Sequence, residues 1–109
     1  WNGRALMEEF LPSVVACTPG EWADVIVADN GSTDDSIEML KTKFPTVGII
    51  RLDKNYGFAE GYNQALKHIG HEYTVLLNSD VEVTPGWLDA PIAWLIWGFS
   101  NTRFIIFVI

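Results

Sequence analysis

Two carboxylates stand close together after an apolar run in the second half of the chain. The apolar residues 75–77 lead directly into the polar residues 78–80, and Pro85 ends the extended pattern. If the backbone stays extended as far as Glu82, the side chains of Asp80 and Glu82 point to the same side, because strand side chains alternate with a period of two. Paired carboxylates at the end of a buried strand predict a site for a divalent cation.

Alternating helix and strand patterns surround this segment. The apolar periodicity predicts helices over residues 5–16, 37–44 and 57–69, a further helix from Pro85, and strands over residues 25–28, 47–52 and 73–77. Strands that alternate with helices through short connections specify a parallel sheet. We therefore predict an α/β fold, a Rossmann-like three-layer parallel sheet with helices on both faces.

Local signals predict where the helices begin and end. Ser32 or Thr33 is the expected N-cap of the second helix, and Gly70 is the expected C-cap of the third. Thr84 is expected to cap the helix that starts at Pro85. The apolar spacing of the third helix predicts an inward face made of Phe58, Ala59, Tyr62, Ala65, Leu66 and Ile69.

Polar residues follow each of the three predicted strands. They occupy residues 29–31, 53–57 and 78–80. In open parallel sheets, ligands bind outside the carboxyl ends of the strands. We therefore expect these three loops to gather at one edge of the sheet and to form the binding site.

Three segments together resemble inverting family 2 glycosyltransferases of the GT-A fold. Residues 27–36 read VADNGSTDDS, residues 55–63 contain NYGFA followed by Gly61 and Asn63, and residues 77–82 read LNSDVE. They occur in the family's order and at its spacing over about residues 3 to 92. Each segment alone is a weak signal, but the combination is specific.

The resemblance implies a nucleotide-diphospho-sugar donor and assigns residues to it. Asp29 matches the acidic residue that contacts the base, with Asn30 beside it; the alternative for Asp29 is a turn and capping role. Asn55, Gly57 and Asn63 belong to the segment that lies along the nucleotide in the family. A glycine at position 57 would allow close approach of the backbone.

The resemblance also assigns a role to the paired carboxylates of Asp80 and Glu82. Asp80 and Glu82 stand where the family carries its metal motif, and Ser79 beside them is a candidate donor contact. Oxygen ligands of this kind suit Mg²⁺ or Mn²⁺, which would offset the charge of the donor diphosphate. Glu82 has a longer side chain than the family's usual Asp. The alternative to a metal-binding role for Glu82 is a position facing solvent.

The ends of the chain depart from the family pattern. The resemblance implies a strand before Trp1 and a downstream acidic residue that acts as catalytic base. Neither has a match in this sequence. The residue that acts as catalytic base is therefore unknown. We expect residues 1–92 to be a partial GT-A domain that binds the donor. Residues 93–109 form an apolar tail, an added strand or a site of self-association through residues 104–109.

Composition restricts the partners. Seven Lys and Arg against fourteen Asp and Glu give a net charge of −7, which disfavours binding to nucleic acid. The single cysteine, Cys17, favours a reducing compartment, which fits a cytoplasmic setting. For the full-length protein we expect a position at the inner face of the membrane. The expected acceptor is a saccharide or lipid-linked hydroxyl, as in cell-envelope polysaccharide synthesis. Two alternatives stay open: a nucleotide-binding α/β domain without sugar transfer, and a self-associating fragment.

Overall fold

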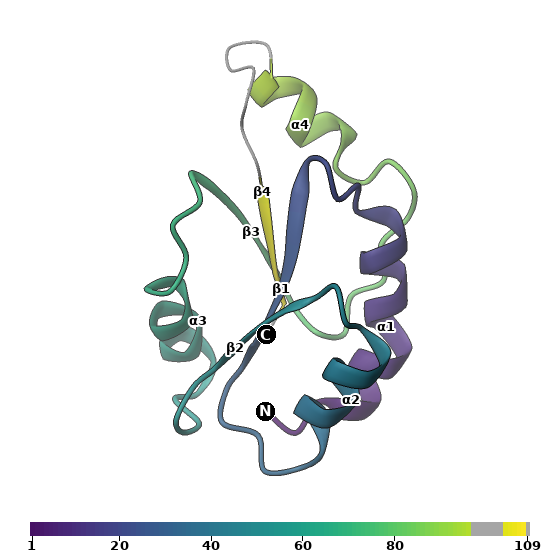
Figure 1. The fold of residues 1–109 in the computed structure, drawn as a ribbon. Coiled ribbons are helices and arrows are strands. Elements are labelled where there is room, and N and C mark those ends of the chain that lie inside the picture. Colours follow the sequence, from purple (N-terminus) through teal and green to yellow (C-terminus); the bar gives the residue numbers. More distant parts are fainter. Residues whose placement is uncertain (97–103, 109) are drawn as a thin grey trace.

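The computed structural model describes residues 1–96 and 104–108, in which helices and strands alternate (Figure 1). Their order is α1 Arg4–Cys17, β1 Ala23–Asp29, α2 Ser36–Lys43, β2 Gly48–Arg51, α3 Phe58–Leu66, β3 Tyr73–Leu77, α4 Asp89–Ile96 and β4 Phe104–Val108. The α/β class predicted from the sequence is confirmed.

The four strands form one parallel sheet in the order β2-β1-β4-β3. β4, the last strand in the chain, lies between β1 and β3. In its register Ile106 is level with Val25 of β1 on one side and with Val75 of β3 on the other. The strands that end at Asp29 and at Leu77 are therefore held in one sheet through β4.

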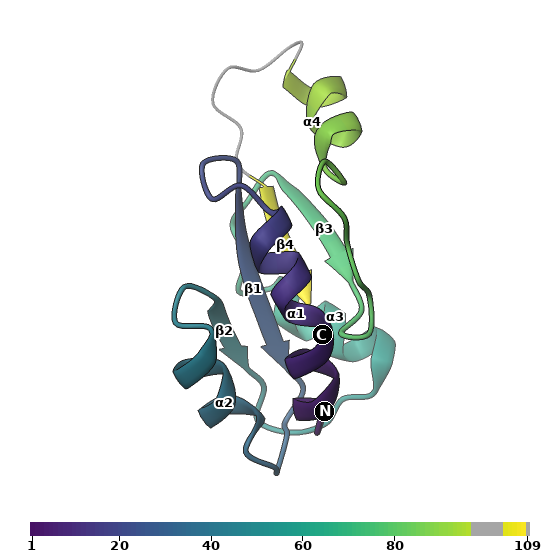
Figure 2. The same cartoon turned by 90° about the vertical axis from the view of Figure 1, so that its right-hand side faces the viewer.

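Helices cover both faces of the sheet (Figures 1 and 2). α1 and α2 lie on one face, where buried side chains from both helices pack with Val27 of β1. α3 lies on the other face, where Tyr62 and Ala65 pack with Ala28. Adjacent strand residues thus enter different cores. Burial on both faces explains why residues 25–28 of β1 are a continuous apolar run without polar alternation.

The beginning of α2 differs from the prediction. The helix is preceded by Asp35, and no side-chain hydrogen bond caps it there. The carboxylate of Asp34 accepts hydrogen bonds from the backbone N–H and hydroxyl of Ser36. The predicted caps, Ser32 and Thr33, lie before this turn and contact the N-terminal segment of the chain instead.

α3 is shorter than predicted, and its first turn faces outward. The helix ends at Leu66, with Lys67 as its C-cap, so the expected cap at Gly70 is wrong. Phe58 is 68% exposed and Ala59 is also exposed, so both are wrong as inward-facing residues. Helical periodicity could not show that these two residues face outward, because exposed and core apolar residues of a helix can have the same spacing.

The segment after β3 is also less regular than predicted. Thr84 does not cap a helix, because α4 begins only at Asp89. The backbone of Gly86 has a φ of 79°, outside the helical region. Turn hydrogen bonds from Trp87 N–H to Thr84 O, and from Asp89 N–H to Gly86 O, occupy this stretch.

The position of β4 bears on the hypothesis of self-association. Pairing with a second chain through residues 104–109 needs a free backbone edge. Residues 104–108 are paired on both sides inside the sheet, so such pairing would require the sheet to open. Position 109 lies outside the described residues, as do residues 97–103 of the predicted tail.

The pairing of β4 predicts a strong effect of proline at position 106. Ile106→Pro removes a backbone N–H from the middle of the sheet. We expect the free energy of unfolding in urea to fall by about 1–3 kcal/mol for each buried partner that is left unpaired. The matched variant Ile106→Val keeps the N–H and should cost less. Equal losses in the two variants would contradict the central position of β4.

Candidate functional site

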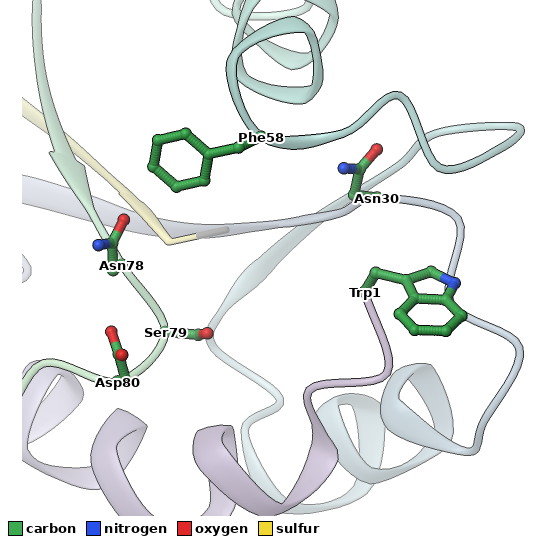
Figure 3. Close-up of a pocket in the computed structure, with 6 residues that line it drawn as sticks. All are labelled: Trp1, Asn30, Phe58, Asn78, Ser79 and Asp80. Carbon is green, nitrogen blue, oxygen red and sulfur yellow. The ribbon is translucent and has the colours of Figure 1, made fainter.

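A cavity of about 240 Å³ opens at the carboxyl edge of the sheet. Four separate segments contribute its lining: the N-terminal residues, the loop after β1, the start of α3 and the loop after β3 (Figure 3). The lining residues are Trp1, Asn30, Phe58, Asn78, Ser79 and Asp80. The loops that follow β1 and β3 therefore meet at one site.

The end of β3 places Asp80 on the cavity wall. The strand stops at Leu77, and Ser79 and Asp80 form a turn, so the backbone does not stay extended to Glu82. Val83 is buried in the core on the α1 face. Asp80 and Glu82 are both exposed, but Asp80 lines the cavity and Glu82 does not.

Tyr62 connects α3 to the loop that carries Asp80. Its side chain is largely buried, and its hydroxyl lies 3.2 Å from the carbonyl oxygen of Leu77 and 3.1 Å from Oδ1 of Asn78. Burial, and then the nearby charge of Asp80, raise the pKa of Tyr62. The hydroxyl therefore stays protonated at neutral pH and donates to the end of β3.

Asp29 is buried and engaged in the protein's own structure. It is 4% exposed, and both of its carboxylate oxygens accept from the backbone N–H of Ser32, at 3.3 and 3.1 Å. The Nε of Arg51 lies 4.0 Å from Oδ2. These contacts match the turn role that the sequence left open for Asp29, and it is the neighbouring Asn30 that lines the cavity beside Asp80.

Asn2 holds the N-terminal segment against the loop after β1. Its backbone N–H donates to Oγ of Ser32 at 2.8 Å. Its Oδ1 accepts from the backbone N–H groups of Thr33 at 2.9 Å and Asp34 at 3.3 Å. The residue has a φ of 50°, which asparagine tolerates better than most. These contacts fix Trp1 at the cavity, a residue that the sequence analysis did not select.

Two exposed aromatic side chains border the cavity. Trp1 is 58% exposed and Phe58 is 68% exposed. Phe58 makes an edge-to-face contact with Tyr62, with ring centroids 5.3 Å apart. Figure 3 shows both side chains at the cavity, together with Asn30 and Ser79. The signal that could have identified Phe58 is its position directly after Gly57, at the carboxyl edge of the sheet.

Three other predicted residues, Asn55, Gly57 and Asn63, are not among those that line the cavity. Asn55 is exposed and accepts from the N–H of Gly57 at 2.8 Å. Gly57 has a φ of 77°, which requires glycine, and no described protein atom lies within 4 Å of the position that a Cβ would take. Asn63 is exposed on α3, where its amide lies 3.4 Å from the carboxylate of Glu60.

The donor atoms at the cavity are hard oxygens. Asp80 supplies a carboxylate, Ser79 a hydroxyl and Asn78 an amide oxygen, a set that suits Mg²⁺ or Mn²⁺. Within residues 1–96 and 104–108, no group of three or more His, Cys, Asp or Glu side chains could hold a metal. The residues therefore fit a cation that takes one protein carboxylate and completes its shell with water and ligand phosphate oxygens.

A parallel α/β sheet with a polar cavity at its carboxyl edge defines a Rossmann-like binding domain. The chain belongs to glycosyl transferase family 2, whose family model matches residues 1–99. The family's GT-A fold is present in part, as one sheet between two helical layers. The match extends beyond residue 92, where the sequence-based resemblance ended.

Two bacterial glycosyltransferases are similar to this chain. An N-acetylglucosaminyl-diphospho-decaprenol L-rhamnosyltransferase of Mycobacterium tuberculosis is 27% identical over 95 residues, or 77% of this chain and 31% of the relative. The uncharacterized glycosyltransferase YfnE of Bacillus subtilis is 39% identical over 84 residues, or 74% of this chain and 21% of the relative. The chain thus spans a third or less of these relatives. No solved structure matches it.

The Tyr62 hydroxyl predicts a measurable contribution to stability. Tyr62→Phe removes the buried donor to Leu77 and Asn78 and should lower the free energy of unfolding by about 1 kcal/mol. The matched variant is Tyr56→Phe, whose hydroxyl donates to Asp53 at the exposed surface. Urea unfolding should show a smaller loss for Tyr56→Phe, and the reverse order would contradict this assignment.

Two glycines predict different costs for the same substitution. Gly31 and Gly57 both have positive φ values, of 70° and 77°, and alanine there costs about 1–3 kcal/mol. A Cβ on Gly31 would also lie 2.4 Å from the carbonyl carbon of Lys54, whereas one on Gly57 meets open space. Urea unfolding should therefore show a larger loss for Gly31→Ala. Similar losses would mean that the two loops are not in close contact.

Proposed function

We propose that the chain binds a nucleotide-diphospho-sugar donor at the cavity lined by Asp80 and Asn30. The observation that carries the proposal is the meeting of the β1 and β3 loops at one cavity that combines hard oxygen donors with two exposed aromatic side chains. Aromatic faces suit the flat ring of a nucleobase, and a carboxylate suits a cation bound to diphosphate. The cavity, at about 240 Å³, is small, so it would hold part of the donor.

Charge supports a role for a divalent cation. The chain has a net charge of −7, and its cavity carries the carboxylate of Asp80, so a diphosphate would be repelled without a cation. Asp80 would hold the ion, with Ser79 and Asn78 as neighbouring oxygen donors. A bound Mg²⁺ or Mn²⁺ supplies neutralisation of the charge that develops on the departing nucleoside diphosphate. Glu82 is a candidate to approach the ion through water.

The proposed reaction is an inverting sugar transfer by the whole protein. The acceptor hydroxyl oxygen forms a bond to the anomeric carbon, and the bond from that carbon to the diphosphate oxygen breaks. The nucleoside diphosphate leaves with the electron pair, and a general base takes the hydroxyl proton. No residue of this chain is assigned as that base, so we assign the chain the donor half of the reaction.

The acceptor proposal rests on a relative. The name of the mycobacterial protein specifies transfer of L-rhamnose to N-acetylglucosaminyl-diphospho-decaprenol. By similarity we propose a saccharide or lipid-linked hydroxyl as acceptor, which would bring the reaction to the cytoplasmic face of a membrane. Across the described part of the chain, no helix is long and apolar enough to cross a bilayer.

Calorimetric titration with UDP-sugars and GDP-sugars, with and without Mn²⁺, tests the donor site. We expect binding that depends on the cation and falls by more than about tenfold in Asp80→Asn, which keeps the shape of the side chain and removes its charge. Glu72→Gln removes one negative charge just before β3 and should leave affinity unchanged. A loss of cation-dependent affinity in Glu82→Gln would show that a second carboxylate contributes to cation binding.

The outcomes separate the candidate functions. If nucleotide affinity changes neither with the cation nor in Asp80→Asn, the chain has no donor site of this kind. That result would indicate a nucleotide-binding domain without sugar transfer. Absence of binding by the wild-type chain with every donor would contradict the proposal altogether.

A further inference from the structure

We infer that Asn30 is a positioning residue that holds residues 55–57 against the end of β1 and so sets the cavity wall at Phe58. The inference concerns how the site is built and rests on the proposed function only for the ligand. Asn30 lines the cavity, yet it is 5% exposed. Its role therefore depends on what its amide contacts within the protein.

The amide of Asn30 is engaged by the loop that follows β2. Its Oδ1 accepts from the backbone N–H of Tyr56 at 2.9 Å. Its Nδ2 donates to the carbonyl oxygen of Gly57 at 2.8 Å and lies 3.3 Å from Oδ1 of Asn55. An asparagine amide has two N–H donors, and both are directed at these oxygens. They are therefore not available to a ligand.

Asn55 extends this arrangement. Its Oδ1, which faces Nδ2 of Asn30, also accepts from the backbone N–H of Gly57 at 2.8 Å. Residues 53–56 belong to no helix or strand, so their backbone groups have no ladder to satisfy them. The backbone N–H of the half-buried Tyr56 needs a partner, and Oδ1 of Asn30 provides it. The carbonyl oxygen of Gly57 accepts from the N–H of Gly61 at 3.2 Å, and Nδ2 of Asn30 gives it a second donor.

Two glycines fix the amide in place. A Cβ on Gly61 of α3 would lie 2.7 Å from Nδ2 of Asn30, so only a glycine lets the helix approach this closely. On the other side, the close contact of Gly31 with the backbone of Lys54 brings the two loops together. The Asn30 side chain is thus enclosed between the end of β1 and α3 and cannot turn toward a ligand without disrupting both contacts.

This geometry requires an amide at position 30. A carboxylate there would keep an acceptor for the N–H of Tyr56. It would also place an anionic oxygen against the carbonyl of Gly57 and Oδ1 of Asn55, and neither of these can donate a proton. Phe58 follows Gly57 directly and lines the cavity, so a shift of the loop would move the wall on which the ligand rests.

Two variants of Asn30 test the inference in the ligand-free chain. Asn30→Asp replaces both donors by an oxygen, and Asn30→Ala removes the amide without adding charge. By NMR we expect amide hydrogen exchange at Tyr56 to be at least about tenfold faster in Asn30→Ala, which removes the acceptor of its N–H. Exchange at Gly57 should be faster in both variants, because both remove the N–H donor that faces Oδ1 of Asn55. Gln64→Glu adds one negative charge on the outside of α3 and should leave exchange at both amides unchanged.

Donor binding is measured on the same proteins by calorimetry with UDP-glucose and GDP-mannose in the presence of Mn²⁺. A displaced cavity wall should weaken the binding of both nucleotide sugars by a similar factor of about tenfold, because no base-specific hydrogen bond is lost. Loss of one nucleotide alone, with exchange at Tyr56 unchanged, would overturn the inference in favour of direct base contact.

The two proposals fail in different ways. If the wild-type chain binds neither nucleotide, the proposed function fails, while the exchange rates still decide the role of Asn30. If the wild-type chain binds and both Asn30 variants keep wild-type exchange and affinity, the positioning role fails alone. Should the Asn30 variants not fold, Asn55→Ala removes the acceptor of the Gly57 N–H from an exposed position. It should give faster exchange at Gly57.

Discussion

The pairing of β4 with both β1 and β3 is the interaction on which the rest of the structure depends. β1 and β3 do not pair with each other, so their relative position is set by the strand between them. Two residues that line the cavity lie in the loops that follow these strands, Asn30 after β1 and Asp80 after β3. The strand between them therefore determines how far apart the two sides of the cavity lie.

At the edge of the sheet, side-chain hydrogen bonds take over from the strand ladders. Asn2 holds the N-terminal segment to the loop after β1, and Asn30 holds the loop after β2 to the same place. Tyr62 does the same for the end of β3. Each of these side chains bonds groups in a loop or at the end of a strand or helix. The cavity is thus built from irregular segments that polar side chains order before any ligand arrives.

Sequence patterns predicted the sheet better than the site. β3 was predicted at its observed bounds, because a short apolar run between polar loops has few alternative structures. Phe58 and Asp29 show why the site was harder to predict. An apolar residue at helical spacing reads as core even when it borders a cavity. An acidic residue after a strand has the same sequence signal whether it contacts a ligand or, as Asp29 does, accepts from the N–H of Ser32 in a turn. Such distinctions depend on contacts between segments far apart in the sequence.

The two aspartates at the strand ends differ in a way that explains their separate roles. Asp29 is buried, accepts from the backbone N–H of Ser32 and has Nε of Arg51 at 4.0 Å, so its carboxylate contacts groups of the protein itself. Asp80 is exposed at the cavity, and its charge acts on Tyr62. A charge compensated internally stabilises a loop, whereas a charge left open to the cavity can attract a cation from solvent.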